Sequence, residues 1–220
     1  MRSEWHEFSI YGCMENTEDK ERKSGIIPEQ NTGKAIDAES HLALGDDAEA
    51  KDFFEQAKKR LQHVNQWEDY AGNLSASFQL IDGNGNEVQR AAQRGDYFKI
   101  DIPGPGSESG KGYDWVQIED VVNKTIDEGE IFGFRVRPTD NPKSEKEDVA
   151  HFYSEDSTSS FLVERRGNVV TASVHDRNTK PNTDADSTID KIRDAVVGAV
   201  GVMTFSKIQW QNLTDGLVKK

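Results

Sequence analysis

Short segments in which apolar and polar residues alternate dominate the sequence between residues 75 and 175. A period of two predicts β-strands, because successive side chains of a strand point to opposite faces of its sheet. Turn-forming residues separate the segments, and Arg166-Gly167-Asn168 gives the clearest hairpin signal. Short turns join antiparallel neighbours, so the pattern predicts a mostly antiparallel sheet of about six or seven strands. The predicted strands are residues 75–81, 97–102, 113–122, 131–136, 161–165 and 169–175, with a further short one at 149–153.

A helical pattern precedes the strands. After a cap at Asp46 or Asp47, apolar residues recur every three or four positions as far as Trp67, and Gly72 marks the end. This spacing predicts one amphipathic helix. Its apolar positions are Ala50, Phe53, Ala57, Leu61, Val64 and Trp67.

A second long helix is predicted after the strands, from a cap at Ser187. Gly198 and Gly201 lie inside it, and a helical Gly costs ~1 kcal/mol relative to Ala. We therefore expect another element to pack closely there. The apolar stripe consists of Ile189, Ile192, Val196, Met203 and either Ala199 or Val200.

The order of elements predicts an α+β domain, with a curved sheet between an N-terminal amphipathic helix and a long C-terminal helix. Two arrangements of the sheet remain open. It either stays open and wraps the C-terminal helix, or its strands after Arg94 begin a small SH3-like or OB-like barrel. The open sheet is favoured, because a long apolar helix needs a large surface to cover it.

Residues 1–45 differ from the rest of the chain. Residues 1–50 carry 12 acidic and 5 basic residues, a net charge of −7 out of −13 for the whole chain. We expect residues 1–45 to form an acidic, largely flexible segment and residues 46–220 to form a single domain. The alternation of Trp5, Phe8, Ile10 and Tyr11 allows one short strand there, docked at the edge of the sheet.

Composition and charge narrow the classes of function. The 40 acidic residues against 27 basic ones argue against nucleic acid as a partner, because binding phosphates relies on clustered Lys and Arg. Cys13 is the only cysteine, which excludes an intrachain disulfide. The longest uncharged apolar run, residues 195–206, would rise only ~18 Å as a helix, too short to cross a ~30 Å hydrocarbon core. We expect no membrane insertion and a cytoplasmic protein.

Several segments together resemble a family of uncharacterised bacterial proteins. They are GDYFKIDIPGPG, GYDWVQIEDV, FRVRPTDNP, AHFYSEDSTSSF and NTKPN, and the resemblance covers roughly residues 67–218. It implies no activity, ligand or catalytic residue. The order of elements also resembles the helix-grip arrangement of START-like lipid-binding proteins, in architecture alone.

Two motifs suggest ligands but lack essential parts. Residues 104–111 are rich in Gly and end in Lys111, yet Pro105 and Gly112 occupy positions where a phosphate-binding loop needs Gly and Ser or Thr. Asp82, Asn84 and Asn86 have the oxygen spacing of a calcium loop, but the turn glycine and the final Glu of that loop are missing. We therefore expect a strand connector and a turn, with no cofactor and no metal.

The candidate catalytic group is His151 with Tyr153 and Asp156, because a histidine beside a carboxylate can perform acid–base chemistry. His175 is the other histidine in the strand region. Neither histidine has the spacing of a metal-binding motif. The aromatic residues that could line an apolar ligand pocket are Tyr113, Trp115, Phe134, Phe152 and Trp210.

Two functions from different classes remain. The favoured one is a non-enzymatic interaction module that contacts another protein or a second copy of itself, with Gly198 and Gly201 as the contact face. It rests on the lack of a complete catalytic motif in the sequence. The alternative is a binder of a small apolar ligand in a cavity between sheet and helix, with or without hydrolase or lyase activity.

Overall fold

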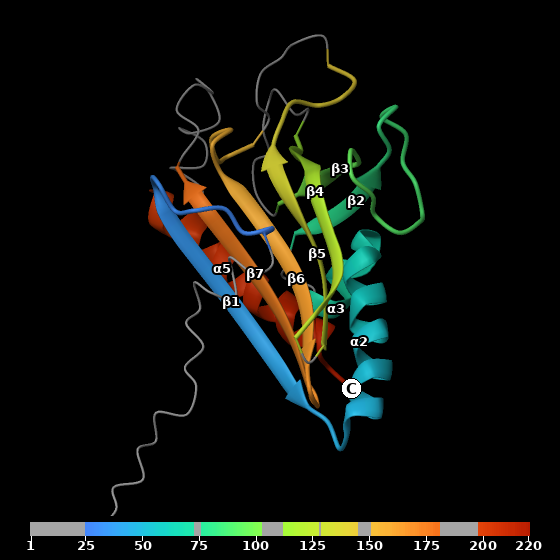
Figure 1. The fold of residues 1–220 in the computed structure, drawn as a ribbon. Coiled ribbons are helices and arrows are strands. Elements are labelled where there is room, and N and C mark those ends of the chain that lie inside the picture. Colours follow the sequence, from blue (N-terminus) through green and yellow to red (C-terminus); the bar gives the residue numbers. More distant parts are fainter. Residues whose placement is uncertain (1–24, 73–75, 103–111, 128, 145–150, 181–197) are drawn as a thin grey trace, which may run out of the picture.

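A computed structural model of the chain describes residues 25–72, 76–102, 112–127, 129–144, 151–180 and 198–220, with side chains of the last helix from residue 204 onward. Seven antiparallel strands form one sheet in the order β1-β7-β6-β5-β4-β3-β2 (Figure 1). The strands are β1 (Lys34–Ala43), β2 (Ser77–Ile81), β3 (Tyr97–Asp101), β4 (Asp114–Ile126), β5 (Gly129–Pro138), β6 (Thr158–Arg166) and β7 (Val169–Thr179). The helices are α2 (Asp47–Gln62), the 3-10 turn η1 (Val64–Gln66), α3 (Trp67–Ala71) and α5 (Gly198–Leu217).

The sheet is open and curved. Strands β2 to β7 are antiparallel neighbours in chain order. Strand β1, which comes before α2 in the sequence, pairs with β7 at the other end of the sheet. Because β1 and β2 are the two edges, the predicted α+β fold with an open sheet is confirmed and the small barrel is wrong. The predicted β6–β7 hairpin is also found, with Arg166 opposite Val169 and Gly167 at a φ of 52°.

Strand β1 lies before residue 46, where the sequence leads us to expect the domain to begin. Its ten residues lie within the segment expected to be flexible, yet they pair with β7 along its length. The buried positions of β1 include Ala38 and Ser40, which are too small to give a clear alternating signal. The edge strand expected around residues 5–11 lies outside the described residues.

The first predicted helix is interrupted. The Asp46 cap is present, and its side chain accepts a hydrogen bond from the Glu49 N–H. Helix α2 then ends at Gln62, and Asn65 in η1 accepts from the Leu80 N–H (2.5 Å) and donates to the Val88 carbonyl (2.8 Å). These bonds tie the turn to β2, and they compete with continuation of the helix. Trp67, which follows, lies in the centre of the core.

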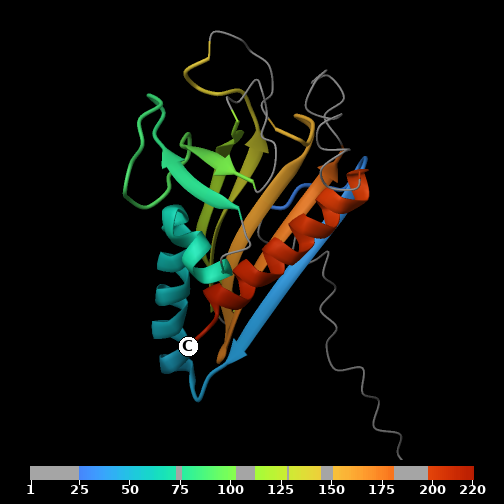
Figure 2. The same ribbon diagram turned by 180° about the vertical axis from the view of Figure 1, so that it is seen from behind.

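The helices of the described residues all lie on one face of the sheet, which we call the inner face (Figure 2). Trp67 packs there on Phe78, Phe98, Phe134 and Phe161, with ring centroids 4.9–6.0 Å apart. The opposite face, the outer face, carries two smaller clusters, one around Ile26, Ile131 and Leu162, and one around Ile81 and Trp115.

Helix α5 crosses the inner face, as predicted for the C-terminal helix (Figure 2). Residues 187–197, where that helix was expected to begin, lie outside the described residues, as do the side chains around Gly198 and Gly201. The short strand expected at 149–153 is not formed in its described part, because residues 151–153 belong to the loop before β6. No helix among the described residues is long and apolar enough to cross a membrane.

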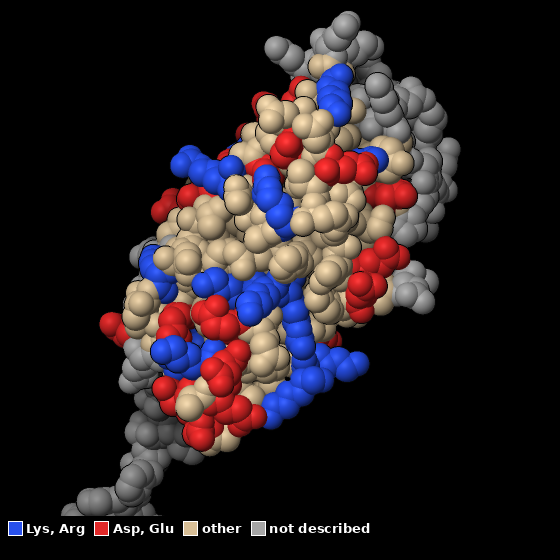
Figure 3. Space-filling view, turned by 90° about the vertical axis from the view of Figure 1, so that its right-hand side faces the viewer, with Lys and Arg blue, Asp and Glu red and all other residues tan. Residues whose placement is uncertain are grey.

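The side of the molecule that carries α2 has mixed charge. Lys and Arg side chains lie among Asp and Glu side chains on this surface (Figure 3). On α2 itself, Lys58 forms a salt bridge with Glu55 at 3.7 Å. The two signs of charge are therefore interspersed on this side.

Candidate ligand-binding site

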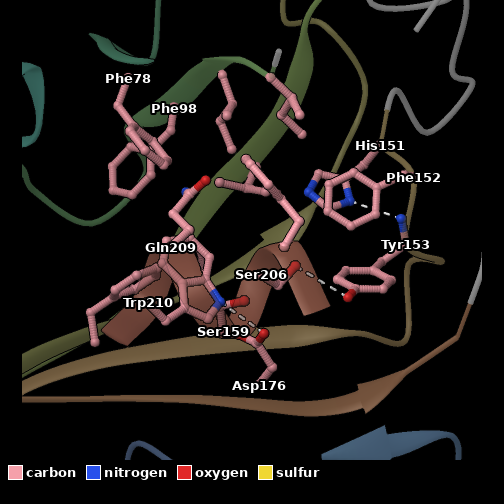
Figure 4. Close-up of a pocket in the computed structure, with 16 residues that line it drawn as sticks. Phe78, Phe98, His151, Phe152, Tyr153, Ser159, Asp176, Ser206, Gln209 and Trp210 are labelled. Carbon is pink, nitrogen blue, oxygen red and sulfur yellow. Dashed lines mark hydrogen bonds between the residues drawn. The ribbon is translucent and has the colours of Figure 1, made fainter. Parts of the chain in front are cut away.

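A cavity of about 40 Å³ lies between the inner face of the sheet and α5 (Figure 4). Strands β2 to β6 supply mostly apolar walls, α5 supplies both aromatic and polar side chains, and the loop before β6 supplies three aromatic rings. The lining residues are Phe78, Phe98, Ile100, Ile102, Val116, Val136, His151, Phe152, Tyr153, Ser159, Phe161, Asp176, Phe205, Ser206, Gln209 and Trp210.

Asp176 is the most unusual member of this lining. The alternation of β7 places it on the inner face, after the buried Ala172 and Val174. It is 1% exposed, and its Oδ2 accepts a hydrogen bond from the Trp210 indole N–H at 2.9 Å. The other oxygen, Oδ1, is buried and has no hydrogen-bond partner among the described residues.

The protonation of Asp176 follows from its burial. Loss of hydration raises the pKa of this carboxyl to about 6, while Ser159, opposite on β6, and the Trp210 N–H favour the charged form. At neutral pH the carboxyl is therefore mostly ionised. Oδ1 of this buried negative charge has no hydrogen-bond partner in the part of the chain that the structure describes.

His151 is neutral in this environment. Burial lowers its pKa to about 3, and its Nδ1 accepts a hydrogen bond from the Tyr153 N–H at 2.9 Å. The ring proton therefore lies on Nε2. The imidazole stacks on Phe152 with centroids 4.4 Å apart.

Tyr153 completes the polar side of the cavity. Its hydroxyl lies 3.4 Å from the Ser206 hydroxyl of α5. Burial and the negative charge of Asp176 both raise the pKa of Tyr153, so the phenol stays protonated. Asp176 is thus the one charged group in the described lining at neutral pH.

The structure brings together part of the residues singled out from the sequence. His151, Phe152, Tyr153 and Trp210 all line the cavity. Phe134 lies in the layer behind it, against Phe98 and Phe161.

Three other candidates lie away from the cavity. Tyr113 and Trp115 pack with Ile81 on the outer face. The exposed Asp156 carboxylate lies 3.9 Å from Lys180 Nζ. The role of these residues in a site stays a prediction that the geometry does not support.

Sequence reasoning missed Asp176, Ser159, Ser206 and Gln209. A signal for Asp176 was present, because an Asp follows Val170, Ala172 and Val174 at the next inward position of a regular alternation. Such a position normally holds an apolar residue. The other three are ordinary polar residues, and only the packing of α5 on the sheet brings them together.

The described residues also clarify the calcium-like motif. Oδ1 of Asp82 accepts hydrogen bonds from the backbone N–H groups of Asn84 and Asn86, at 2.9 and 2.8 Å. This is the geometry of a turn. In the described ranges no three His, Cys, Asp or Glu residues gather as a group that could hold a metal ion. The Gly-rich residues 104–111 lie outside these ranges.

No family model matches the chain, and the curated proteins give no match. Among solved structures, it is similar to Ara h 8.0201 (15% identity, 85% of this chain and 100% of that one, TM-score 0.32). It is also similar to the ginseng major latex-like protein 151 from Panax ginseng (11%, 85% and 100%, TM-score 0.35). A Staphylococcus epidermidis protein solved by solution NMR is a further similar structure (13%, 86% and 92%, TM-score 0.34). Similarity at this level indicates no shared function, and the proposals below rest on this chain's own residues.

Proposed function

We propose that this protein binds a small, largely apolar ligand that carries a protonated amine, in the cavity beside Asp176. The observation that supports this is Asp176, which lines the cavity and whose buried Oδ1 lacks a hydrogen-bond partner among the described residues. A buried carboxylate is costly unless it is paired and hydrogen-bonded. A ligand with a cationic donor supplies both.

The surrounding groups favour a cation over an anion. His151 and Tyr153 are uncharged at neutral pH, so the ionised Asp176 determines the charge of the described lining. Phe78, Phe98 and the other apolar walls suit a hydrocarbon portion of the ligand. The polar and apolar walls together fit an amine at one end of a small hydrophobic group.

The size of the cavity limits the ligand. A water needs ~10–15 Å³ of such volume, so about 40 Å³ holds a few waters or a short alkylamine. A ligand with an aromatic ring requires side chains to move. Phe152 and Phe205 line the cavity and are only half-buried, so we propose that they rotate outward on binding.

We propose binding and not histidine-based catalysis. A general base acts best when its pKa lies near the working pH, and a pKa of about 3 makes His151 a poor base at neutral pH. The hydrolase or lyase alternative therefore has no support from the histidine in this cavity.

The test uses three probes with one benzyl skeleton: benzylamine, benzyl alcohol and benzoate. Binding to the full chain at pH 7.5 is followed by NMR shifts of the Trp210 indole and by calorimetry. We expect benzylamine to bind at least ten times more tightly than benzyl alcohol, and benzoate most weakly. Asp176→Asn should remove the preference for the amine. The matched control is Asp156→Asn, which neutralises an exposed carboxylate outside the cavity and should leave the preference intact.

Phe152→Ala enlarges the cavity and separates lack of room from lack of affinity. If neither the wild type nor Phe152→Ala binds benzylamine at millimolar concentration, the proposal is wrong. Equal affinity for benzylamine and benzyl alcohol would show that Asp176 does not recognise a cation.

A second candidate, the interaction module, has one supporting observation. Ile208 of α5 is 56% exposed and borders a groove of about 500 Å³ between α5 and β1. Lys34 and Lys207 also line this groove. Sedimentation of the wild type and Ile208→Glu at rising concentration tests self-association, because only contact through this groove would be weakened by the substitution.

A further inference from the structure

The outer face of the sheet holds a second group of linked polar side chains. Oγ of Ser173 lies 3.0 Å from Nε2 of His175, and Nδ1 of His175 lies 2.7 Å from Oδ1 of Asp37. A serine, a histidine and a carboxylate therefore form a continuous chain of hydrogen bonds. None of the three lines the cavity, since alternation along β7 puts Ser173 and His175 on the face opposite to Asp176.

The sheet fixes this group through its register. Ser173 and His175 are two residues apart on β7, so their side chains stand side by side. Asp37 on β1 is directly opposite His175. Strand β7 is paired on both sides, with β1 and β6, which holds the three backbones rigidly.

The hydrogen bonds select one tautomer of the imidazole. Arg177 Nη1 donates to Asp37 Oδ1 at 2.7 Å, so the carboxylate is held as an acceptor. Burial raises the pKa of Asp37, but the hydrogen bonds from His175 and Arg177 outweigh it and lower the pKa overall. The ionised Asp37 therefore accepts the Nδ1–H, and Nε2 accepts the hydrogen bond of the Ser173 hydroxyl.

We propose that Ser173 is an activated nucleophile that takes the acyl group of small, activated esters, with His175 as its general base and Asp37 as a positioning residue. As Oγ attacks the carbonyl carbon, its proton passes to Nε2. The bond to the leaving alcohol then breaks, and the leaving oxygen receives that proton. Water releases the acyl group by the same route.

The surroundings restrict the substrate. Ser173 is opposite Leu162, which packs with Ile131 and Ile26, so the apolar neighbours of Ser173 favour a short apolar acyl group. Ser173 is 8% exposed, which admits only small reagents. The backbone of β7 is hydrogen-bonded to β1 on one side and to β6 on the other. Its N–H groups in the described strands are therefore not arranged as an oxyanion hole. The expected substrates are therefore activated esters and not amides.

Phenylmethylsulfonyl fluoride tests the nucleophile directly. Attack by Ser173 forms an Oγ–S bond and breaks the S–F bond, so fluoride leaves and His175 takes the proton. We expect peptide mass spectrometry to place one adduct on Ser173 in the folded full chain and none in the urea-unfolded chain. We also expect slow release of p-nitrophenol from p-nitrophenyl acetate.

Substitutions then separate the roles. Ser173→Ala should abolish labelling, His175→Gln should slow it at least 100-fold, and Asp37→Asn should slow it less, with partial recovery in Asp37→Glu. The matched control is Ser160→Ala, on the neighbouring strand and the same face, whose hydroxyl donates to the Ile26 carbonyl. It should leave labelling of Ser173 unchanged. Absence of an adduct on Ser173 in the folded wild type, or equal rates in wild type and His175→Gln, overturns the proposal.

Discussion

Two aspartates occupy inward positions next to apolar inward residues of their strands. Asp176 lies near the C-terminal end of β7. Asp114 is the first residue of β4 and lies on the same face as Val116 and Ile118. Burial raises the pKa of Asp114 to about 8 and that of Asp176 to about 6. Both carboxyls reduce stability when they ionise, so each is expensive to keep unless it serves a purpose.

Asp114 should give the protein an unusual loss of stability at mildly alkaline pH. Its folded pKa of about 8 lies above the unfolded value of ~3.9, so the folded state binds the proton more tightly and stability falls as pH rises between them. From pH ~6.5 to ~8 the change amounts to ~1.5 kcal/mol of unfolding free energy. Urea unfolding at the two pH values measures it.

Between these two pH values the fall in stability comes mainly from Asp114. Asp176 is mostly ionised in this range, and His151, neutral in the folded state, is half-protonated at pH ~6.5 in the unfolded chain, so its own effect is a small rise of stability with pH. Asp114→Asn should therefore lose no stability between the two pH values. An identical decline in wild type and variant would mean that another group causes it.

At the scale of elements, the sequence predicts a strand wherever large apolar residues alternate with polar ones. Strands β2 to β7 present Phe, Ile, Leu or Val on the inner face, and each was found from the sequence within a few residues of its ends. Strand β1 was missed, because the small residues Ala38 and Ser40 hold two of its three buried positions. The break after α2 was missed because Asn65 bonds to β2, a tertiary contact with no local signal.

The candidate site could be predicted only in part from the sequence. Aromatic content pointed to Phe152 and Trp210, but a period of two does not say which face of a strand meets the helices. Trp115 therefore could not be distinguished from its neighbour Val116, which faces the cavity. The face is decided by the register between strands and by the path of α5.

The contact between α3 and α5 requires Gly216. A Cβ at this position would lie 2.3 Å from the Tyr70 carbonyl oxygen, which belongs to the backbone and cannot move alone. Gly to Ala inside a helix normally gains up to ~1 kcal/mol. We expect Gly216→Ala instead to lower the unfolding free energy by ~2 kcal/mol or more, because the helices must separate. Thermal and urea unfolding measure the change.

The matched control for this contact is Asn212→Ala on the exposed side of the same helix. It should be neutral or slightly stabilising, since Ala has the higher helix propensity. A Gly216→Ala variant as stable as the wild type would show that α3 and α5 do not approach so closely.

At the scale of the whole molecule, the sheet separates two proposed sites. The amine site lies between the inner face and α5, and the Ser173 group lies on the outer face, although both draw on β7. Substitutions at one should leave the other unchanged, provided that the sheet stays intact. This depends on β1, which supplies Asp37 to the outer group and covers part of α5.

Strand β1 should therefore be indispensable, although it lies before the boundary expected from the sequence. Its Ser40 hydroxyl lies 2.8 Å from the Thr214 hydroxyl of α5, and Ile36 and Ala38 are buried. A chain of residues 25–220 retains these contacts and should unfold cooperatively at nearly the urea midpoint of the full chain. A chain of residues 46–220 loses them and leaves the long β7 edge unpaired, so we expect it to aggregate or to show no cooperative transition. Near-ultraviolet circular dichroism and urea unfolding compare the three chains. If residues 46–220 unfolded at the same midpoint as residues 25–220, β1 would contribute nothing to stability and the domain would begin at Asp46.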